Sequence, residues 1–420
     1  MVQITGSADI SLKDLGIDMQ SKRLMRIYNK NKILDLIRKN HSIYRAELAR
    51  LTGLSMPTIM NITDELIDDG LIRDAGKGIS SGGKPPMLLE LIPESHLFAG
   101  VDISGAMFKC TILDLQGNIV FSRSREKEGQ PLTEIIEAVE EFIDTSISAS
   151  GVDREKLSGI GVGIPGLVDT ADGMVITSID YNLKQVDFRT PLQRRFNMPV
   201  FIENSSKVMA IGEKWFGAGT NCDDFALVTV GRGIGAALII NGEIYRGFNN
   251  MSGELGHMVI NPNGPICKCG RQGCLEAMAS GKAIANQARN LVAGGGESRM
   301  LELAGGNINK INSDIVFKAA AMGDLLARRI ADDAVYNLSI GLTNLVCLFD
   351  CQRIVLTGYV VKDNKYLLEK VSEYINSTRS LYYGNVPVEV RLSELGEEAA
   401  VIGAGALPLQ NFLIVSWICL

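Results

Sequence analysis

One histidine and three cysteines lie close together between residues 253 and 276, in the sequence GELGHMVINPNGPICKCGRQGCLE. They are His257, Cys267, Cys269 and Cys274, separated by nine, one and four positions. Glycines and prolines between them permit the tight turns that such close thiols need in order to converge. Three thiolates and one neutral imidazole form a soft, tetrahedral donor set that suits Zn²⁺. The alternative is a buried histidine beside unrelated small cysteines.

The predicted zinc ion is structural, with one ion per chain. Because all four ligand positions are taken by protein, none remains for a catalytic water. Two carboxylates, Glu254 and Glu276, flank the cluster. We therefore expect the ion to organise a polar ligand site rather than to take part in chemistry.

The chain as a whole has the composition of a soluble globular protein. It has 420 residues, 46% hydrophobic and 21% charged, with a net charge of −6 that gives no global attraction to nucleic acid. Free cysteines indicate a reducing compartment, and no segment has the roughly 20 apolar residues that span a bilayer. We interpret the protein as cytoplasmic and not membrane-bound. We divide it into a flexible start (1–20), an N-terminal domain (21–92), a larger body (95–406) and an apolar tail of unassigned role (407–420).

The sequence from 45 to 72, RAELARLTGLSMPTIMNITDELIDDGLI, has the pattern of a helix-turn-helix. Ala49 is small enough for close helix packing, and Gly53 permits the sharp turn. Ser55 is placed to cap the second helix, whose first turn tolerates Pro57. The spacing predicts that this second helix enters the major groove of DNA. The alternative is a helical hairpin used for protein contacts.

Basic residues precede this motif. Between 22 and 39 a single acid, Asp35, is accompanied by Lys22, Arg23, Arg26, Lys30, Lys32, Arg38 and Lys39. Such a run alone is typical of a solvated helix face. Beside a helix-turn-helix it favours a DNA-binding domain.

The segment LIRDAGKGISSGGKPPMLLEL (71–91) predicts two strands around a tip, the wing of a winged helix. From the wing we expect contacts to phosphates or the minor groove by Lys77, Ser80, Ser81 and Lys84. From the second helix we expect contacts by Ser55, Met56, Thr58, Met60 and Asn61. Asn61 has the groups to read adenine bidentately.

After Pro93, strands and helices alternate. Strands or hairpins are expected within 98–120, 157–169, 199–217, 225–245, 353–360 and 388–407, and an amphipathic helix at 131–150. Asp102 follows one strand, and glycine-rich turns follow others, which together predict a phosphate site between two lobes. The predicted fold class is α/β, with an N-terminal winged helix-turn-helix before a two-lobed body.

With these motifs, the chain resembles the ROK family (repressors, open reading frames and sugar kinases) over about residues 21–406. The segment from 253 to 276 resembles the family's zinc and sugar signature, and the wing ending in SSGGKPP resembles that of its transcriptional regulators. The family's kinases usually lack the winged helix. The resemblance implies an actin-like, hexokinase-type body (ribonuclease H-like) with a sugar between its lobes. It also implies homodimers or dimers of dimers.

The resemblance carries sugar contacts onto particular residues, which are Asn204, Glu254, His257 and Glu276, with Gly166 and Asn182 as additions. Carboxylates and amides suit this role because they engage adjacent hydroxyls bidentately. One His257 nitrogen would ligate zinc, leaving the other for a sugar hydroxyl or a carboxylate. The sequence leaves open a glucose-like, xylose-like, N-acetyl or phosphorylated sugar.

The position after Glu203-Asn204 departs from the kinases of the family. Those kinases place an aspartate there as general base, and this chain has Ser205. A serine hydroxyl has no useful proton affinity near pH 7, and loss of a general base slows a reaction roughly 10²–10⁴-fold. We therefore assign no catalytic residue.

The nucleotide-binding motifs also differ from those of the family's kinases. The first phosphate loop, from Asp102 to Ala106, has Ser104 and Ala106 where the kinases have glycine and threonine. The second phosphate turn has Arg232 where threonine is usual, and Thr357-Gly358-Tyr359 replaces the paired glycines expected near adenosine. Phosphoryl transfer needs the base, the phosphates and Mg²⁺ positioned together.

We therefore predict a sugar-responsive transcriptional regulator, a repressor of carbohydrate-utilisation genes, that binds operator DNA as a dimer and is not an enzyme. The alternative from another class is a sugar kinase that phosphorylates a hexose with ATP and carries an appended DNA-binding domain. A third possibility is a regulator released from DNA by a protein effector, such as a transporter subunit.

Overall fold

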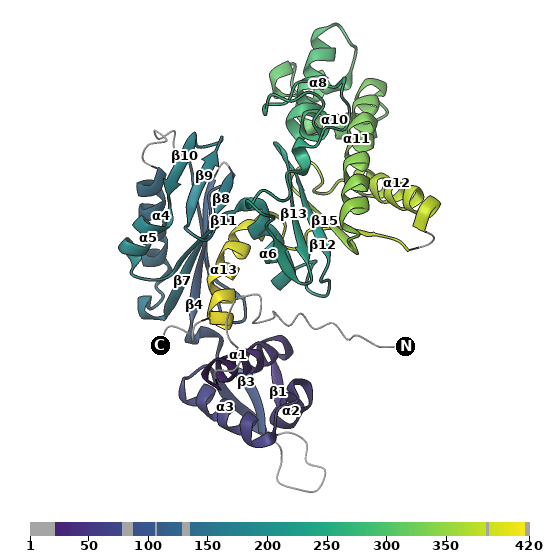
Figure 1. The fold of residues 1–420 in the computed structure, drawn as a ribbon. Helices are drawn as coiled ribbons and strands as arrows, with labels where there is room; N and C mark the ends of the chain where they lie inside the picture. Colours follow the sequence, from purple (N-terminus) through teal and green to yellow (C-terminus); the bar gives the residue numbers. More distant parts are fainter. Residues whose placement is uncertain (1–21, 78–86, 106, 128–134, 384–385, 416–420) are drawn as a thin grey trace. The chain divides into compact units, whose positions relative to one another are not determined.

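A computed structural model of the chain describes residues 22–77, 87–105, 107–127, 135–383 and 386–415 (Figure 1). The chain divides into two compact units, one formed by Met1–Val208 with Ala400–Leu420 and the other by Met209–Ala399. Unit 1 holds the winged helix and the first lobe of the body, and unit 2 is the second lobe. Among the described residues, no helix is long and apolar enough to cross a membrane.

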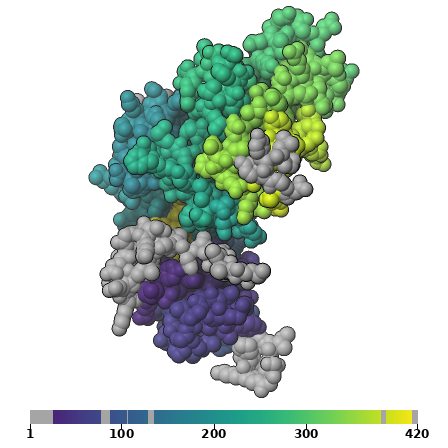
Figure 2. Space-filling model, turned by 45° about the vertical axis from the view of Figure 1, so that its right-hand side comes forward, coloured from purple at the N-terminus to yellow at the C-terminus, as the bar shows by residue number. Residues whose placement is uncertain are grey.

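The winged helix has three helices and a small antiparallel sheet with strand order β1-β3-β2 (purple in Figure 2). Its elements are α1 (Lys22–Asn40), β1 (Ser42–Tyr44), α2 (Arg45–Thr52), α3 (Met56–Asp68), β2 (Ile72–Lys77) and β3 (Met87–Leu91). The two wing strands are those predicted from 71–91. The short strand β1, which pairs Ile43 with Leu89, was not predicted.

The turn of the helix-turn-helix forms as its sequence predicts. Gly53 has φ 73° and its N–H donates to the Ala49 carbonyl over 2.9 Å, which ends α2. The Ser55 hydroxyl accepts from the Thr58 N–H and caps α3, and Pro57 lies in the first turn. Leu48 of α2 and Ile59 and Leu66 of α3 are fully buried, so the apolar side of α3 lies in the core of the winged helix.

The first lobe is built on a five-stranded sheet of order β11-β7-β4-β5-β6 and a three-stranded sheet of order β10-β9-β8. Its strands are β4 (Leu97–Asp102), β5 (Met107–Asp114), β6 (Ile119–Glu126), β7 (Leu157–Ile164), β8 (Leu167–Asp169), β9 (Met174–Ser178), β10 (Leu183–Asp187) and β11 (Val200–Asn204). Its helices are α4 (Ile135–Ser150), α5 (Arg189–Phe196), the start of α6 (Ser205–Phe216) and α13 (Ala399–Val415).

Helix α13 packs on the central strands of this sheet almost backbone to backbone. A Cβ at Gly100 would lie 2.1 Å from the Val401 carbonyl oxygen, and one at Gly161 would lie 1.9 Å from that of Ala404. Glycine at these positions of β4 and β7 therefore permits the close approach of α13 to the sheet. The helix continues to Val415 with Leu409 buried, so the boundary predicted at residue 406 falls inside it, and the described part of the apolar tail packs within unit 1.

The second lobe repeats the strand pattern of the first. Its sheet has the order β14-β13-β12-β15-β16, with two antiparallel pairs followed by two parallel pairs, as in β6-β5-β4-β7-β11. The strands are β12 (Phe225–Val230), β13 (Ile234–Ile240), β14 (Glu243–Tyr245), β15 (Arg353–Thr357) and β16 (Glu389–Leu392). The helices are α7 (Leu275–Ala279), α8 (Gly281–Ala293), α9 (Arg299–Leu303), α10 (Ser313–Ala321), α11 (Leu325–Phe349) and α12 (Lys365–Tyr383).

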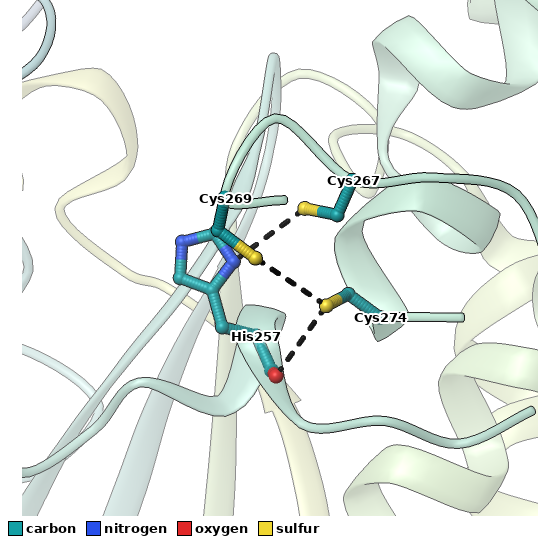
Figure 3. Close-up of side chains that lie close together, drawn as sticks. All are labelled: His257, Cys267, Cys269 and Cys274. Carbon is teal, nitrogen blue, oxygen red and sulfur yellow. Dashed lines mark hydrogen bonds between the residues drawn. The ribbon is translucent and has the colours of Figure 1, made fainter. Parts of the chain in front are cut away.

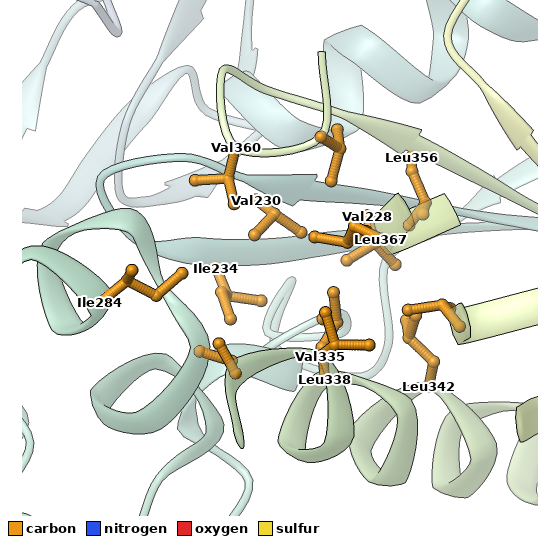
Figure 4. Packing of buried hydrophobic residues seen from close by; sticks show 14 of the residues in the cluster. Val228, Val230, Ile234, Ile284, Val335, Leu338, Leu342, Leu356, Val360 and Leu367 are labelled. Atoms are coloured by element: carbon orange, nitrogen blue, oxygen red, sulfur yellow. The ribbon is translucent and has the colours of Figure 1, made fainter. Parts of the chain in front are cut away.

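The core of the second lobe lies between its sheet and its helices. Val228 and Val230 of β12 and Leu356 of β15 pack with Leu338 and Leu342 of α11 (Figure 4). All are almost fully buried. This packing holds the loops that follow β12 and β15, which carry the predicted nucleotide motifs.

Candidate functional site

The loop between β14 and α7 carries the predicted zinc ligands. It folds back on itself through two isolated bridges, Val259 with Cys274 and Ile266 with Gln272. Gly270 and Gly273 have φ of 87° and 76°, and a Cβ at Gly273 would lie 1.6 Å from the Asn261 carbonyl oxygen. Glycine is therefore required at position 273 for the hairpin to close.

The four predicted ligands converge in this loop (Figure 3). One donor atom from each of His257, Cys267, Cys269 and Cys274 lies within 4.8 Å of all the others. The Cys267 Sγ lies 3.6 Å from the His257 Nδ1, and the Cys269 Sγ lies 3.7 Å from the Cys274 Sγ. Cys267 and Cys274 are buried, His257 is half-buried and Cys269 is exposed.

These distances fit a tetrahedral zinc ion. A Zn–S bond of about 2.3 Å places neighbouring sulfur ligands about 3.8 Å apart. The four residues would hold the ion through three Sγ atoms and the His257 Nδ1, which faces the sulfur atoms. The Nε2 lies on the other edge of the ring in Figure 3, which leaves it for another partner.

The two facing thiols differ in acidity. The Arg271 backbone N–H lowers the pKa of Cys269 to about 6. Burial raises the pKa of Cys274 to about 12. A cation is what allows sulfur atoms this close together to carry charge simultaneously.

In unit 2, Glu254, His257 and Glu276 belong to one continuous stretch around the metal site. Glu254 is exposed and precedes a single 3₁₀ turn, Leu255–His257. Glu276 is buried on α7, where one oxygen accepts from the Ile234 N–H over 3.1 Å and the other lies 3.3 Å from the Lys268 Nζ. Glu276 is thus already engaged by the chain's own groups, which the sequence did not indicate.

In unit 1, Asn204 and Gly166 are joined directly. The Asn204 Nδ2 donates to the Gly166 carbonyl oxygen over 2.7 Å, and its Oδ1 accepts from the Ser206 N–H over 2.9 Å. Gly166 has φ 122°, and a Cβ there would lie 2.2 Å from the Thr177 carbonyl oxygen. Asn182 is exposed with φ 50°. The predicted sugar residues thus form two groups, one in each unit.

Ser205 is the first residue of α6 and is 7% exposed. Its buried Oγ has no hydrogen-bond partner among the described residues. Near the first phosphate loop, burial raises the pKa of Asp102. The Ile103 carbonyl after it accepts from Lys127 and from the Tyr181 hydroxyl, two residues that no sequence motif had indicated.

Helix α3 presents most of the predicted side chains to solvent. Met56 and Met60 are 42% and 47% exposed, Asn61 is exposed and Thr58 is half-buried. Exposed methionines on an N-capped helix have no core to pack against, so this face is available for a partner. The side chain of Lys77 and all of Ser80, Ser81 and Lys84 lie outside the described residues.

Part of the basic run of α1 is buried, while Arg26 and Lys39 remain exposed. Lys30 and Arg38 are buried, at 7% and 6% exposed. The Lys30 Nζ lies 2.6 Å from the Asp69 Oδ2, at the end of α3, and Arg38 bonds to Asp35. Arg26 pairs with Glu65 of α3 over 2.7 Å. Two of these cations, Arg26 and Lys30, therefore attach α1 to the end of α3, because the sequence around 64–69 is rich in acids.

Two family models match the chain. The model described as the ROK family matches residues 98–411, and one described as a winged helix-turn-helix DNA-binding domain matches residues 28–73. A xylose repressor of Caldicellulosiruptor bescii is 30% identical over 396 residues, which cover 94% of this chain and 98% of that protein.

Two solved structures of the same family also align with this chain. A ROK family transcriptional regulator, a homologue of the Escherichia coli MLC protein, aligns with a TM-score of 0.80 at 25% identity, covering 94% of this chain and 99% of that one. A ROK family glucokinase from Streptomyces griseus, in complex with glucose and AMPPNP, aligns with a TM-score of 0.63 at 27% identity, covering 75% and 99%. The predicted fold class, a winged helix-turn-helix followed by an actin-like α/β body, is confirmed.

Proposed function

The chain belongs to the ROK family, and on that premise we propose that it is a sugar-responsive DNA-binding repressor with a zinc-braced sugar site and no kinase activity. One observation carries the proposal. The same chain combines a winged helix, whose recognition face is exposed, with a ROK body that has the buried, neutral Ser205 where a kinase needs a base. Such a chain can bind DNA and a sugar without transferring phosphate.

The family resemblance assigns sugar contacts to residues of each unit. In unit 1, Asn204 is held by Gly166 and by the first turn of α6, so its remaining amide hydrogen has a defined direction for a hydroxyl. In unit 2, zinc would hold the His257 ring through Nδ1 and leave Nε2 for the sugar or for Glu254. Zinc in this role orients a sugar-binding side chain and supplies no chemistry.

The response would depend on a difference between two states. A ligand shifts only an equilibrium between states that it binds unequally. A sugar that binds one state of the body more tightly than the other would favour that state. In a dimer, the favoured state would change the separation of two winged helices bound to a pseudo-palindromic operator.

DNA binding with and without sugars tests the proposal. Fluorescence anisotropy would measure the affinity of the full chain for its upstream DNA, alone and with each member of a panel of monosaccharides and sugar 6-phosphates. We expect one member to weaken binding at least about tenfold, or 1.4 kcal/mol. The matched control is Glu254→Gln, which should bind DNA normally but lose the response. Unchanged affinity across the whole panel would contradict a sugar-responsive repressor and would favour release by a protein effector.

The kinase alternative has one observation in its favour, since the glucokinase that aligns over 75% of this chain was solved with glucose and a nucleotide analogue. A coupled assay of ATP consumption with a panel of hexoses decides it. We expect no turnover. Turnover that disappears in Asn204→Ala would establish a kinase and remove that part of the proposal.

A further inference from the structure

The chain passes from one unit to the other at two places, each on a helix. The first passage, between Val208 and Met209, lies inside α6, and the second, between Ala399 and Ala400, lies at the start of α13. Packed helices are among the rigid elements that can carry a conformational change between distant sites. The residues that join α6 to α13 therefore bear on any communication along the chain.

The side chain of Glu213 joins α6 to the segment just before α13. It is fully buried within unit 2, and its carboxylate accepts four hydrogen bonds. The Ala218 N–H donates to Oε2 over 2.7 Å, and the N–H groups of Glu394 and Leu395 donate over 3.3 Å and 3.0 Å. The Ser393 hydroxyl donates to Oε1. One carboxylate of α6 thus holds three consecutive residues that lead into α13.

The neighbours of Glu213 are suited to this contact. A Cβ at Gly217 would lie 2.2 Å from the Glu213 Oε2, so glycine is required there for the carboxylate to fit. The Ser393 hydroxyl also accepts from the Gly396 N–H over 2.7 Å, at the start of the single 3₁₀ turn before α13. A buried carboxylate is stable only when it is hydrogen-bonded, so these donors fix the position of Glu213.

The far ends of both helices lie at places that the proposed function uses. The Asn204 amide oxygen accepts from two N–H groups of the first turn of α6. Near the end of α13, Phe412 packs on the His96 ring, with the ring centroids 4.5 Å apart. His96 follows the short turn Pro93–Ser95, which links the winged helix to β4. Along the two helices, Glu213 therefore lies between an expected sugar contact and the attachment point of the winged helix.

We propose that Glu213 is a positioning residue for the sugar response, because it makes α6 and α13 move together and so passes the state of the sugar site to the winged helix. The proposal rests on the proposed function and concerns how its response is transmitted. Glu213 is fully buried and bonded within unit 2, so we expect it to contact neither sugar nor DNA. Its loss should therefore spare each affinity measured alone and reduce the effect of one ligand on the other.

Two titrations of the full-length chain measure this effect. Calorimetry gives the affinity for D-glucose, D-xylose, N-acetyl-D-glucosamine and glucose 6-phosphate, and anisotropy gives the affinity for upstream DNA with and without each of them. Ser393→Ala removes one donor and keeps the carboxylate. In this variant we expect sugar affinity within about twofold of the wild type, and a DNA response below about threefold against at least about tenfold in the wild type.

Two further variants complete the test. Glu213→Gln should lose the response in the same way, because an amide has one acceptor oxygen in place of two. Ser298→Ala is the matched control and should respond like the wild type. The Ser298 hydroxyl is also half-buried in unit 2, donates to the Asp324 carboxylate and accepts from a backbone N–H at the start of a helix.

The outcomes distinguish this role from the proposed function. Ser393→Ala with the full response, or Ser298→Ala with the same loss, would overturn the role of Glu213. A parallel loss of sugar affinity in Ser393→Ala would also overturn it, because the sugar site itself would then be damaged. Ser393→Ala decides the question if Glu213→Gln fails to fold. A wild-type chain whose DNA affinity no sugar changes would instead contradict the repressor proposal, and the role of Glu213 would fall with it.

Discussion

The side chain of Asn204 joins a glycine turn to a helix, donating to the Gly166 carbonyl over 2.7 Å while accepting from the Ser206 N–H at the start of α6. One amide thus sets the position of a turn and the N-terminus of a helix together. The amide hydrogen holds the turn and the amide oxygen caps the helix, so two substitutions can distinguish their contributions.

We expect Asn204→Ala to lose both hydrogen bonds. Asn204→Asp should lose only the bond to the Gly166 carbonyl, because a carboxylate has no hydrogen to donate. Removing a capping side chain costs about 1 kcal/mol, which the aspartate variant should largely retain because its carboxylate still accepts. Both variants should bind sugar more weakly, since the aspartate has no amide hydrogen. Urea unfolding and sugar calorimetry measure the two effects. An aspartate variant with wild-type sugar affinity would show that the amide donor is not used.

Replacing Cys269 with serine should release zinc. The serine hydroxyl is a poor substitute for a thiolate, and the remaining close sulfur atoms would lose the cation that holds them. We expect less than one zinc per chain by metal analysis, a lower melting temperature and a weaker sugar response. Cys347→Ser changes an exposed cysteine outside the cluster and is the control. Unchanged zinc content and melting in Cys269→Ser would contradict a structural zinc site.

Two substitutions in the winged helix should affect DNA binding differently. Lys84→Ala should weaken binding about equally for all sequences, because a phosphate contact carries no base information, and should reduce the salt slope by about one. Asn61→Ala should cost about 1–3 kcal/mol at one operator position and little elsewhere. Anisotropy titrations with operator variants at several salt concentrations measure both. An equal loss of affinity for all operator variants in Asn61→Ala would mean that Asn61 contacts the DNA backbone rather than a base.

Lys30→Met should destabilise the winged helix. The Lys30 side chain is 9% exposed, and its Nζ lies 2.6 Å from the Asp69 carboxylate, which would lose its partner. A hydrogen bond to a charged group contributes about 1.5–3 kcal/mol to the free energy of unfolding. We expect a loss near the lower end of that range, because the Asp69 side chain is partly exposed to solvent. Arg50→Met, which breaks the exposed pair with Glu47, is the control and should change stability little. Equal stability of the two variants would show that the Lys30 pair does not anchor α1.

Acid should destabilise the chain partly through His96, whose Nδ1 lies 2.7 Å from the Ser158 hydroxyl and whose ring packs on Phe412 of α13. Burial lowers the pKa of His96 below 6.5, so the unfolded chain binds the proton more readily. The stability from this group is full above 6.5 and falls as pH drops toward the folded pKa. Urea unfolding at about pH 7.5 and about pH 5.5 should show a smaller pH effect in His96→Gln than in the wild type. An identical pH effect in both would exclude His96 as a contributor.

Local chemistry could be predicted where the residues involved are close in sequence. The turn at Gly53, the cap at Ser55 and the convergence of His257 with three cysteines depend on short-range geometry, so their spacing was sufficient. The two wing strands could be predicted for the same reason. The short strand β1 was missed because three residues carry too little periodicity to stand out before their partner strand is known.

The sequence alone determined the family, the position of the helix-turn-helix and the cluster of His257 with three cysteines, because propensity, turn chemistry and ligand type act over a few residues. Only the tertiary structure decided what the long-range neighbours do. It buried the side chains of Lys30 and Arg38 and paired them with Asp69 and Asp35, engaged Glu276 with Ile234 and Lys268, and placed the Tyr359 ring beside Gly231 and Gly281. The reason is physical: burial and pairing depend on which side chains the fold brings together, and no spacing along the chain records that.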